Sequence, residues 1–93
     1  QDIAELIRIQ DKALNYASNF VKRDGFLVYS TCTMNPDENE NRVYEFLRKN
    51  TKYELVDVSD KISSEYIQNR FMHTIPYKHN MDGAFAAKLK RIM

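Results

Sequence analysis

The sequence has few of the residues that would indicate a disulfide-rich, metal-binding or membrane-spanning protein. Its 93 residues include one cysteine, two glycines and two prolines. One cysteine cannot form an internal disulfide, so we expect a reducing, intracellular environment. Cys32, His73 and His79 are too few to assemble a four-ligand zinc site, so we expect no bound metal. No apolar run approaches the roughly 18 residues that a membrane span requires, so we expect no transmembrane helix.

The sequence starts at Gln1 and so lacks an initiator methionine. It also shows no basic leader and no signal-peptide pattern. We therefore expect a piece of a longer protein. A chain this short buries only about 60 to 65% of its unfolded surface, which leaves room for one small core.

Charge is unevenly distributed along the chain. Residues 1–60 carry 8 Lys and Arg against 11 Asp and Glu, whereas residues 61–93 carry 6 against 2. The basic C-terminal part is where we expect contacts with phosphates, because Lys and Arg neutralise backbone phosphates and release their counterions. The alternative is that Lys88, Lys90 and Arg91 only solvate a strand.

The apolar pattern predicts a helix, a strand and a second helix in the first half of the chain. A three-and-four spacing of apolar residues indicates an amphipathic helix over Asp2–Arg23. Asp24-Gly25 predicts a turn, and the continuous apolar run Phe26–Tyr29 predicts a strand covered on both faces. Asn35 at the cap, Pro36 and Glu38 predict the start of a helix with a capping box, which ends at Lys49-Asn50.

The second half is predicted to contain two more strands, at Tyr53–Val58 and Phe85–Lys90. Between them lies a long connection, residues 59–82, with a helical turn or two over Ile62–Arg70. The alternation of helices and strands predicts an α/β fold whose first two strands are parallel. Cys32 then lies at the carboxyl end of the first strand, where ligands gather in open α/β sheets.

Cys32 has two interpretations from its local sequence. A cysteine beside a helix N-terminus is favoured as a thiolate nucleophile, whereas the acidic residues of the same turn oppose a thiolate. The alternative is a buried structural cysteine.

The residues around Cys32 carry a family resemblance. Ser-Thr-Cys-Thr after an apolar strand, followed by Glu38-Asn39-Glu40 and a hydrophobic helix, resembles the Sun/Nop/RsmB-type RNA cytosine-5 methyltransferases. The lead-in helix and the closing segment are also similar, the latter comprising Arg70, Pro76, His79 and the run from Asp82 to Leu89. Ala84 stands where that family has a Phe.

The resemblance implies a specific chemistry for Cys32. In this family the cysteine of the Thr-Cys-Thr motif adds to carbon 6 of a cytosine in rRNA or tRNA. Carbon 5 then takes a methyl group from S-adenosylmethionine, and the covalent adduct breaks by elimination. The target base must leave its stack to reach the thiol.

The resemblance also implies the fold. Residues 1–93 would be the C-terminal part of a Rossmann-like methyltransferase domain with three strands, the strand Phe85–Lys90 lying antiparallel between Phe26–Ser30 and Tyr53–Val58. The Gly-rich turn and acidic strand end that bind S-adenosylmethionine, and an Asp with a Pro-Cys pair, have no counterpart here. We therefore expect the donor-binding half to be absent, and the fragment to be inactive alone and to self-associate through the exposed edge of its first strand.

The remaining site residues are predicted as RNA contacts or as shaping residues. Thr31 and Thr33 are expected to shape the cysteine loop at the substrate. Arg70, His79 and Lys88 are expected to contact RNA. Tyr29 and Tyr77 are interpreted either as stacking partners of a base or as packing residues.

Two other functions stay open. One is a non-catalytic RNA-binding or interaction module. The other is a cysteine hydrolase that uses Cys32 with His73 or His79. We expect the protein in the cytoplasm, or in the nucleolus if it is eukaryotic.

Overall fold

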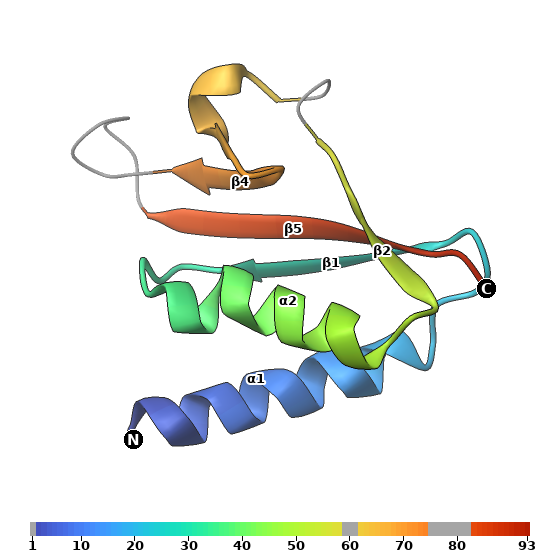
Figure 1. Ribbon diagram of the computed structural model, residues 1–93. Coiled ribbons are helices and arrows are strands. Elements are labelled where there is room, and N and C mark those ends of the chain that lie inside the picture. The colour runs from blue at the N-terminus through green and yellow to red at the C-terminus, as the bar shows by residue number, and fades with distance from the viewer. Residues whose placement is uncertain (1, 59–61, 75–82) are drawn as a thin grey trace.

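The computed structural model describes residues 2–58, 62–74 and 83–93. In chain order, the elements are α1 (Ile3–Ser18), β1 (Phe26–Thr31), the 3-10 helix η1 (Pro36–Glu38), α2 (Glu40–Lys49), β2 (Tyr53–Val56), the 3-10 helix η2 (Ser64–Tyr66), β3 (Ile67–Gln68), β4 (Phe71–Thr74) and β5 (Ala84–Arg91). Both α-helices lie on one side of a single sheet (Figure 1).

The last strand, β5, forms the centre of the sheet. It pairs antiparallel with β1 along one side, and with β4 and then β2 along the other. Because β1 and β2 are both antiparallel to β5, they run parallel to each other, as predicted. The predicted α/β fold and the insertion of the last strand between the first two are therefore confirmed.

The sheet contains five strands where three were predicted. The two extra strands, β3 and β4, form a hairpin within the segment predicted as a long connection with helical turns. Only η2 is helical in residues 62–70. Asn69 and Arg70 have φ angles of 52° and 71°, the paired left-handed conformation of a tight two-residue hairpin turn. Phe71, fully buried, anchors the hairpin in the core.

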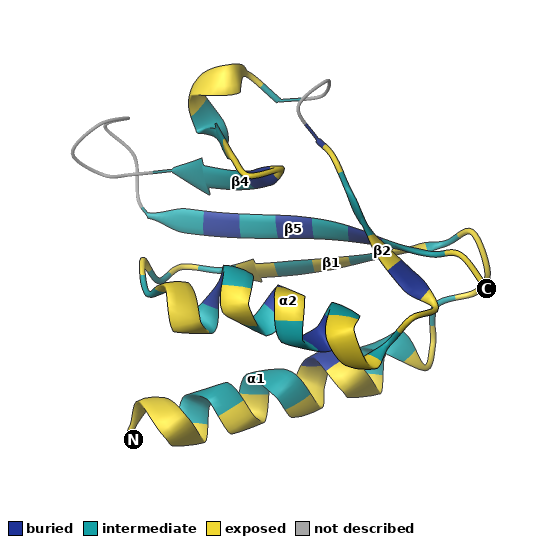
Figure 2. Cartoon of the chain, viewed as in Figure 1, coloured by how far each residue is buried: buried dark blue, intermediate teal, exposed yellow. Residues whose placement is uncertain are grey.

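The core lies between the helices and one face of the sheet. Its buried residues are Leu14, Val43, Phe46, Tyr53, Phe71, Phe85, Ala87 and Leu89. The burial of β5 alternates along the strand, and Figure 2 shows this as dark and light bands. Alternate residues of a strand point to opposite faces, so the odd-numbered residues of β5 face the helices.

The prediction that β1 is covered on both faces is wrong for this chain. Phe26 and Val28 keep 51% and 63% of their surface exposed, while Leu27 and Tyr29 pack against the core. The reason is that α1 and α2 both cover the same face. Among the described residues, no helix covers the other face.

The first helix is shorter than the predicted Asp2–Arg23. Asp2 caps it by accepting a hydrogen bond from the Glu5 amide at 2.8 Å, but the helix ends at Ser18. The Ser18 carbonyl accepts from the Tyr53 hydroxyl at 2.7 Å, which satisfies it outside the helix. The turn into β1 places Asp24, not Gly25, in the left-handed region, with φ at 68°.

The second helix begins with a separate 3-10 turn. Asn35 caps that turn as predicted, since its side chain accepts from the Asp37 amide at 2.9 Å. The predicted capping box is wrong, because the Glu38 carboxylate accepts hydrogen bonds from Gln10 and Thr33. The helix α2 then runs from Glu40 and ends at Lys49, as predicted.

No helix of the described residues is long and apolar enough to cross a membrane. Those residues also contain no cluster of three metal-ligating side chains.

Candidate functional site

Cys32 follows directly after β1, at the carboxyl end of the strand, and its side chain is exposed. This is the position that the sequence predicts for a nucleophile, and the structural alternative of a buried cysteine is wrong. It lies at the end of the sheet where β1 passes into the loop before η1 (Figure 1). The thiol is therefore open to a reactant from outside the chain.

The residues on both sides of Cys32 are held by one buried side chain. The Thr31 hydroxyl donates a hydrogen bond to Asn39 Oδ1, and Asn39 Nδ2 donates to the Thr33 carbonyl at 2.9 Å. Asn39 is only 1% exposed. The loop that carries the cysteine is thus tied to the start of α2.

Glu38 links the same loop to α1. Its carboxylate accepts from Gln10 Nε2 at 3.1 Å and from the Thr33 hydroxyl at 3.3 Å. Its carbonyl accepts from the Tyr29 hydroxyl at 2.6 Å. The cysteine loop is therefore hydrogen-bonded to a strand and to both helices.

Tyr29 packs in this structure and does not stack in the open. Its ring lies edge-on to Phe85, with centroids 6.3 Å apart. The pKa of the Tyr29 phenol is raised to about 12, chiefly by burial, with smaller opposing contributions from Arg42, which lowers it, and from Asp11 and Glu38, which raise it. The hydroxyl therefore stays a hydrogen-bond donor at neutral pH. Tyr77, its counterpart in the sequence prediction, lies outside the described residues.

His73 lies on the helix-covered face, one strand beyond Phe85. Phe85 pairs with Thr31 on one side and with His73 on the other. Neighbouring strands are about 4.8 Å apart, so the backbones of Thr31 and His73 are separated by roughly 10 Å. His73 Nε2 lies 3.3 Å from Glu40 Oε2, and the imidazole packs edge-on to Phe85 at 5.0 Å.

Of the predicted RNA contacts, Arg70 and Lys88 lie in the described residues, and neither lies beside Cys32. Arg70 occupies the turn between β3 and β4. This is the end of β4 that lies farther from Thr31, because His73, near the opposite end, shares the partner Phe85 with Thr31. Lys88 pairs with Val28, and its ammonium lies 4.1 Å from the centroid of the Phe26 ring on the open face. His79 lies outside the described residues. Their roles as RNA contacts stay predictions, as do those of Thr31 and Thr33.

Sequence reasoning gave no specific role to Asn39 or to the contact between Glu40 and His73. Asn39 and Glu40 both belong to the Glu38-Asn39-Glu40 motif that carries the family resemblance. However, asparagine in a polar stretch before a helix is ordinarily an exposed cap. The signal that could have found Asn39 is its spacing from Thr31 and Thr33, which becomes meaningful only once the loop is known to fold back.

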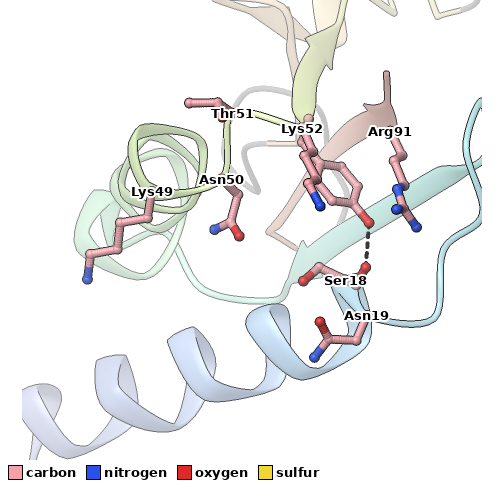
Figure 3. A pocket seen from close by; sticks show the side chains of 8 residues that line it. Ser18, Asn19, Lys49, Asn50, Thr51, Lys52 and Arg91 are labelled. Atoms are coloured by element: carbon pink, nitrogen blue, oxygen red, sulfur yellow. Dashed lines mark hydrogen bonds between the residues drawn. The ribbon is translucent and has the colours of Figure 1, made fainter. Parts of the chain in front are cut away.

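Two open cavities of about 310 and 340 Å³ lie elsewhere on the molecule. The first is at the opposite end of β5, lined by polar and basic residues that include Lys52 and Arg91 (Figure 3). Tyr53 donates to the Ser18 carbonyl at the end of α1, and Arg91 donates at 2.5 Å to the Val21 carbonyl in the turn that follows. The second cavity lies between α1 and the edge of β1. Neither cavity is lined by Cys32.

The glycines of this chain bear on where S-adenosylmethionine could be held. The only glycines are Gly25 and Gly83, and each stands singly just before a strand, β1 or β5. A nucleotide-type cofactor in such folds is held by a Gly-rich turn that leads from a strand into a helix. With its glycines at these two positions, the sequence has no such turn.

Comparison with known proteins finds similar sequences and a similar structure. A protein of Synechocystis sp. described as probable ribosomal RNA small subunit methyltransferase B is 34% identical over 96% of this chain and 21% of its own length. The tRNA (cytosine(72)-C(5))-methyltransferase of Pyrococcus horikoshii is 41% identical over 77% of this chain and 18% of its own length. The crystal structure of NSun6 from Pyrococcus horikoshii with SFG superimposes with a TM-score of 0.79 at 36% identity, covering 94% of this chain and 22% of that one.

The chain thus spans about a fifth of the length of the curated relatives that it matches. Residues 1–90 match the family described as 16S rRNA methyltransferase RsmB/F. The resemblance predicted from the Cys32 motif is therefore confirmed over nearly the whole sequence. This chain belongs to the 16S rRNA methyltransferase RsmB/F family.

Proposed function

We propose that this chain supplies the nucleophile of an RNA cytosine-5 methyltransferase, and that Cys32 is that nucleophile. The observation that carries the proposal is an exposed thiol at the carboxyl end of β1 whose two flanking residues are both hydrogen-bonded to a buried side chain. A solvent-open sulfur on a rigid loop is what an attack on an external base requires. The substrate class follows from the relatives, which act on rRNA or tRNA by their names.

The proposed step forms a bond between Cys32 Sγ and carbon 6 of the target cytosine. The electron pair of the carbon 5–carbon 6 double bond moves to carbon 5, which takes the methyl group as the sulfur–methyl bond of the donor breaks and the donor leaves as a neutral thioether. A base outside these residues then removes the proton from carbon 5, the double bond re-forms and the thiolate leaves. The target base must first be extruded from its stack, because a stacked base hides carbon 6.

The methyl group would come from S-adenosylmethionine held by residues other than those described here. The chain offers no Gly-rich strand-to-helix turn to bind that donor. The 93 residues alone are therefore proposed to be inactive, since catalysis needs donor and acceptor in one site.

A covalent trap tests the role of Cys32. RNA that carries 5-azacytidine at its target position should form an adduct with the complete protein that contains this sequence, and Cys32→Ala should abolish it. The matched control is Met34→Ala, which changes an exposed residue of the same loop. Mass spectrometry of the digested adduct locates the modified residue. An adduct that persists in Cys32→Ala would contradict the proposal.

The same experiment separates the alternatives. A non-catalytic RNA-binding module would bind the RNA but give no adduct in any variant. A cysteine hydrolase is less well supported, because the His73 imidazole lies beside Glu40 and one strand beyond Phe85. A catalytic histidine would lie within hydrogen-bond reach of the cysteine.

We further propose that the 93-residue chain associates with itself through β1. Among the described residues, β1 pairs only with β5, so its other edge has unpaired backbone groups. Phe26 and Val28 add exposed apolar surface beside that edge. Edges of this kind recruit further strands unless they are covered. We propose that the protein is located in the cytoplasm, because a free thiol stays reduced there and the proposed rRNA or tRNA substrates are found there.

A further inference from the structure

Asn39 is a buried polar residue, with 1% of its surface exposed. Burying an amide is costly unless its hydrogen bonds are made, so such residues are retained where the bonds serve a purpose. Here both ends of the amide are used. Oδ1 accepts from Thr31, and Nδ2 donates to Thr33.

The two partners of Asn39 are the immediate neighbours of Cys32 in the chain. Thr31 is the last residue of β1, and Thr33 follows the cysteine in the loop. A hydrogen bond on each side of one residue restricts the backbone of that residue from both directions. Cys32 therefore lies between two residues that a buried side chain holds, and that side chain bonds to these neighbours and not to the thiol.

The backbone of Asn39 is itself firmly placed. Its amide donates to the Pro36 carbonyl at 3.1 Å, and its carbonyl accepts from the amides of Arg42 and Val43 at 3.0 and 3.3 Å. It lies at the junction of η1 and α2 and makes no side-chain cap of α2, so its amide group is available for the loop. Side chains supported on a helix hold a site more precisely than side chains supported on a loop.

We infer that Asn39 is a positioning residue that sets the attack geometry of Cys32. The inference rests on the proposed function, because it concerns the reaction of that thiol with cytosine. It predicts that loss of the amide slows the covalent step while leaving RNA binding intact. Asn39 would then contribute to the reaction without contacting the base.

The test compares adduct formation with RNA affinity in the complete protein that contains this sequence. The rate constant of adduct formation is measured at saturating 5-azacytidine RNA, and the Kd is measured separately by filter binding. A misplacement of about 1 Å in a reacting group can cost up to about 100-fold in rate, so Asn39→Ala should slow the step about 10- to 100-fold. The Kd should change by less than about twofold, because the lost interaction is not with RNA.

The matched control is Asn41→Ala. Asn41 is an exposed asparagine two residues further along the chain, and its Nδ2 donates to Asp37 Oδ1 at 2.9 Å. It has the same chemistry and lies in the first turn of α2, but its amide bonds to Asp37 and not to Thr31 or Thr33. The rate constant of Asn41→Ala should equal that of the unmodified protein.

A second variant, Asn39→Asp, keeps the shape of the side chain and so covers the case in which Asn39→Ala fails to fold. Its carboxylate can accept from Thr31 but cannot donate to the Thr33 carbonyl. Protonation of that carboxyl restores a donor, so the rate of Asn39→Asp relative to the unmodified protein should rise as pH falls. If Asn39 had only a structural role, the ratio of the two rates would not rise as pH falls.

The outcomes separate the inference from the function on which it rests. If the unmodified protein forms the adduct and both Asn39 variants form it at the same rate, the inference is overturned and the function stands. The inference is also overturned if the rate constant and the RNA affinity fall together in both variants. If the unmodified protein forms no adduct through Cys32, the proposed function fails and the inference fails with it.

Discussion

The two faces of the sheet differ in what covers them, although the same strands supply both. On the face beneath α1 and α2, Phe85 and Leu89 are fully buried, and Leu27 packs against them. On the opposite face, Phe26 and Val28 stay more than half exposed. Figure 2 shows the alternation along β5, where buried residues in dark blue alternate with intermediate ones in teal.

The difference teaches that burial follows the covering layer and not the hydrophobicity of the residue. Phe26 and Phe85 are the same amino acid on adjacent antiparallel strands, yet one is 51% and the other 0% exposed. The open face also carries charge, since the Lys88 ammonium lies over the Phe26 ring. The attraction between a cation and an aromatic ring is favourable at an exposed site, so this contact does not require helices on the open face.

The largest expected effect comes from deleting a side chain on the covered face. Phe85 contacts Phe71, Tyr29 and His73 through its ring, with centroid distances of 5.1, 6.3 and 5.0 Å. Phe85→Ala should lower the free energy of unfolding by about 3 to 5 kcal/mol, because it leaves a cavity in a small core. Urea denaturation followed by circular dichroism measures this loss.

The matched substitution on the open face is Phe26→Ala. It removes the contact with Lys88 but creates no cavity, so its cost should stay below about 1 kcal/mol. Equal losses in the two variants would show that the open face is as well packed as the covered one, and the comparison would fail.

A smaller effect is expected from Tyr29→Phe, on the covered face. The change removes the hydrogen bond to the Glu38 carbonyl and should cost about 1 kcal/mol at neutral pH. The pKa of Tyr29 is raised to about 12 from an ordinary value of 10.0, so folding favours the protonated phenol. The stability that this provides is complete below pH 10 and is lost as pH rises through about 12.

The pH dependence gives the sharper measurement. Between pH 10 and about 12, the free energy of unfolding should fall more steeply in the unmodified chain than in Tyr29→Phe. All other ionisable groups are present in both proteins, so their contributions cancel in the difference. Parallel curves would mean that the phenol is not buried in solution.

The smallest effect on stability is expected from Val28→Lys, on the open face. Val28 is 63% exposed, so the substitution should change the free energy of unfolding by no more than about 0.5 kcal/mol. It should nevertheless reduce self-association of the 93-residue chain, because a charged residue blocks the pairing of strand edges. Sedimentation velocity distinguishes monomer from larger species, and Val28→Thr serves as the uncharged control.

Much of the fold was predictable, because the long elements carry strong periodic patterns. The helices α1 and α2, the strand β1 and the strand β5 all appear where the apolar spacing and the caps indicate them. The order of the strands came from the family resemblance, since spacing alone does not say which strands become neighbours. The hairpin of β3 and β4 escaped prediction because strands of two and four residues are too short to show a period.

For the candidate site, the sequence predicted the central residue, Cys32, but not the residue that holds its neighbours, Asn39. Cys32 was recognisable because it is the only cysteine and stands at the end of an apolar run. Asn39 was not, because a hydrogen bond from Thr31 to Asn39 joins residues eight positions apart across a turn. Nothing in the residues between them indicates that the loop folds back.

What the sequence determined by itself is local: the amphipathic stripe of each helix, the caps, the alternation along β5 and the place of the thiol at a strand end. These follow from propensity and periodicity, which act over a few residues. The tertiary structure alone decided that one face of β1 is uncovered among the described residues and that a buried asparagine holds both neighbours of Cys32. Those features depend on contacts between distant segments, because burial is set by whichever elements pack together.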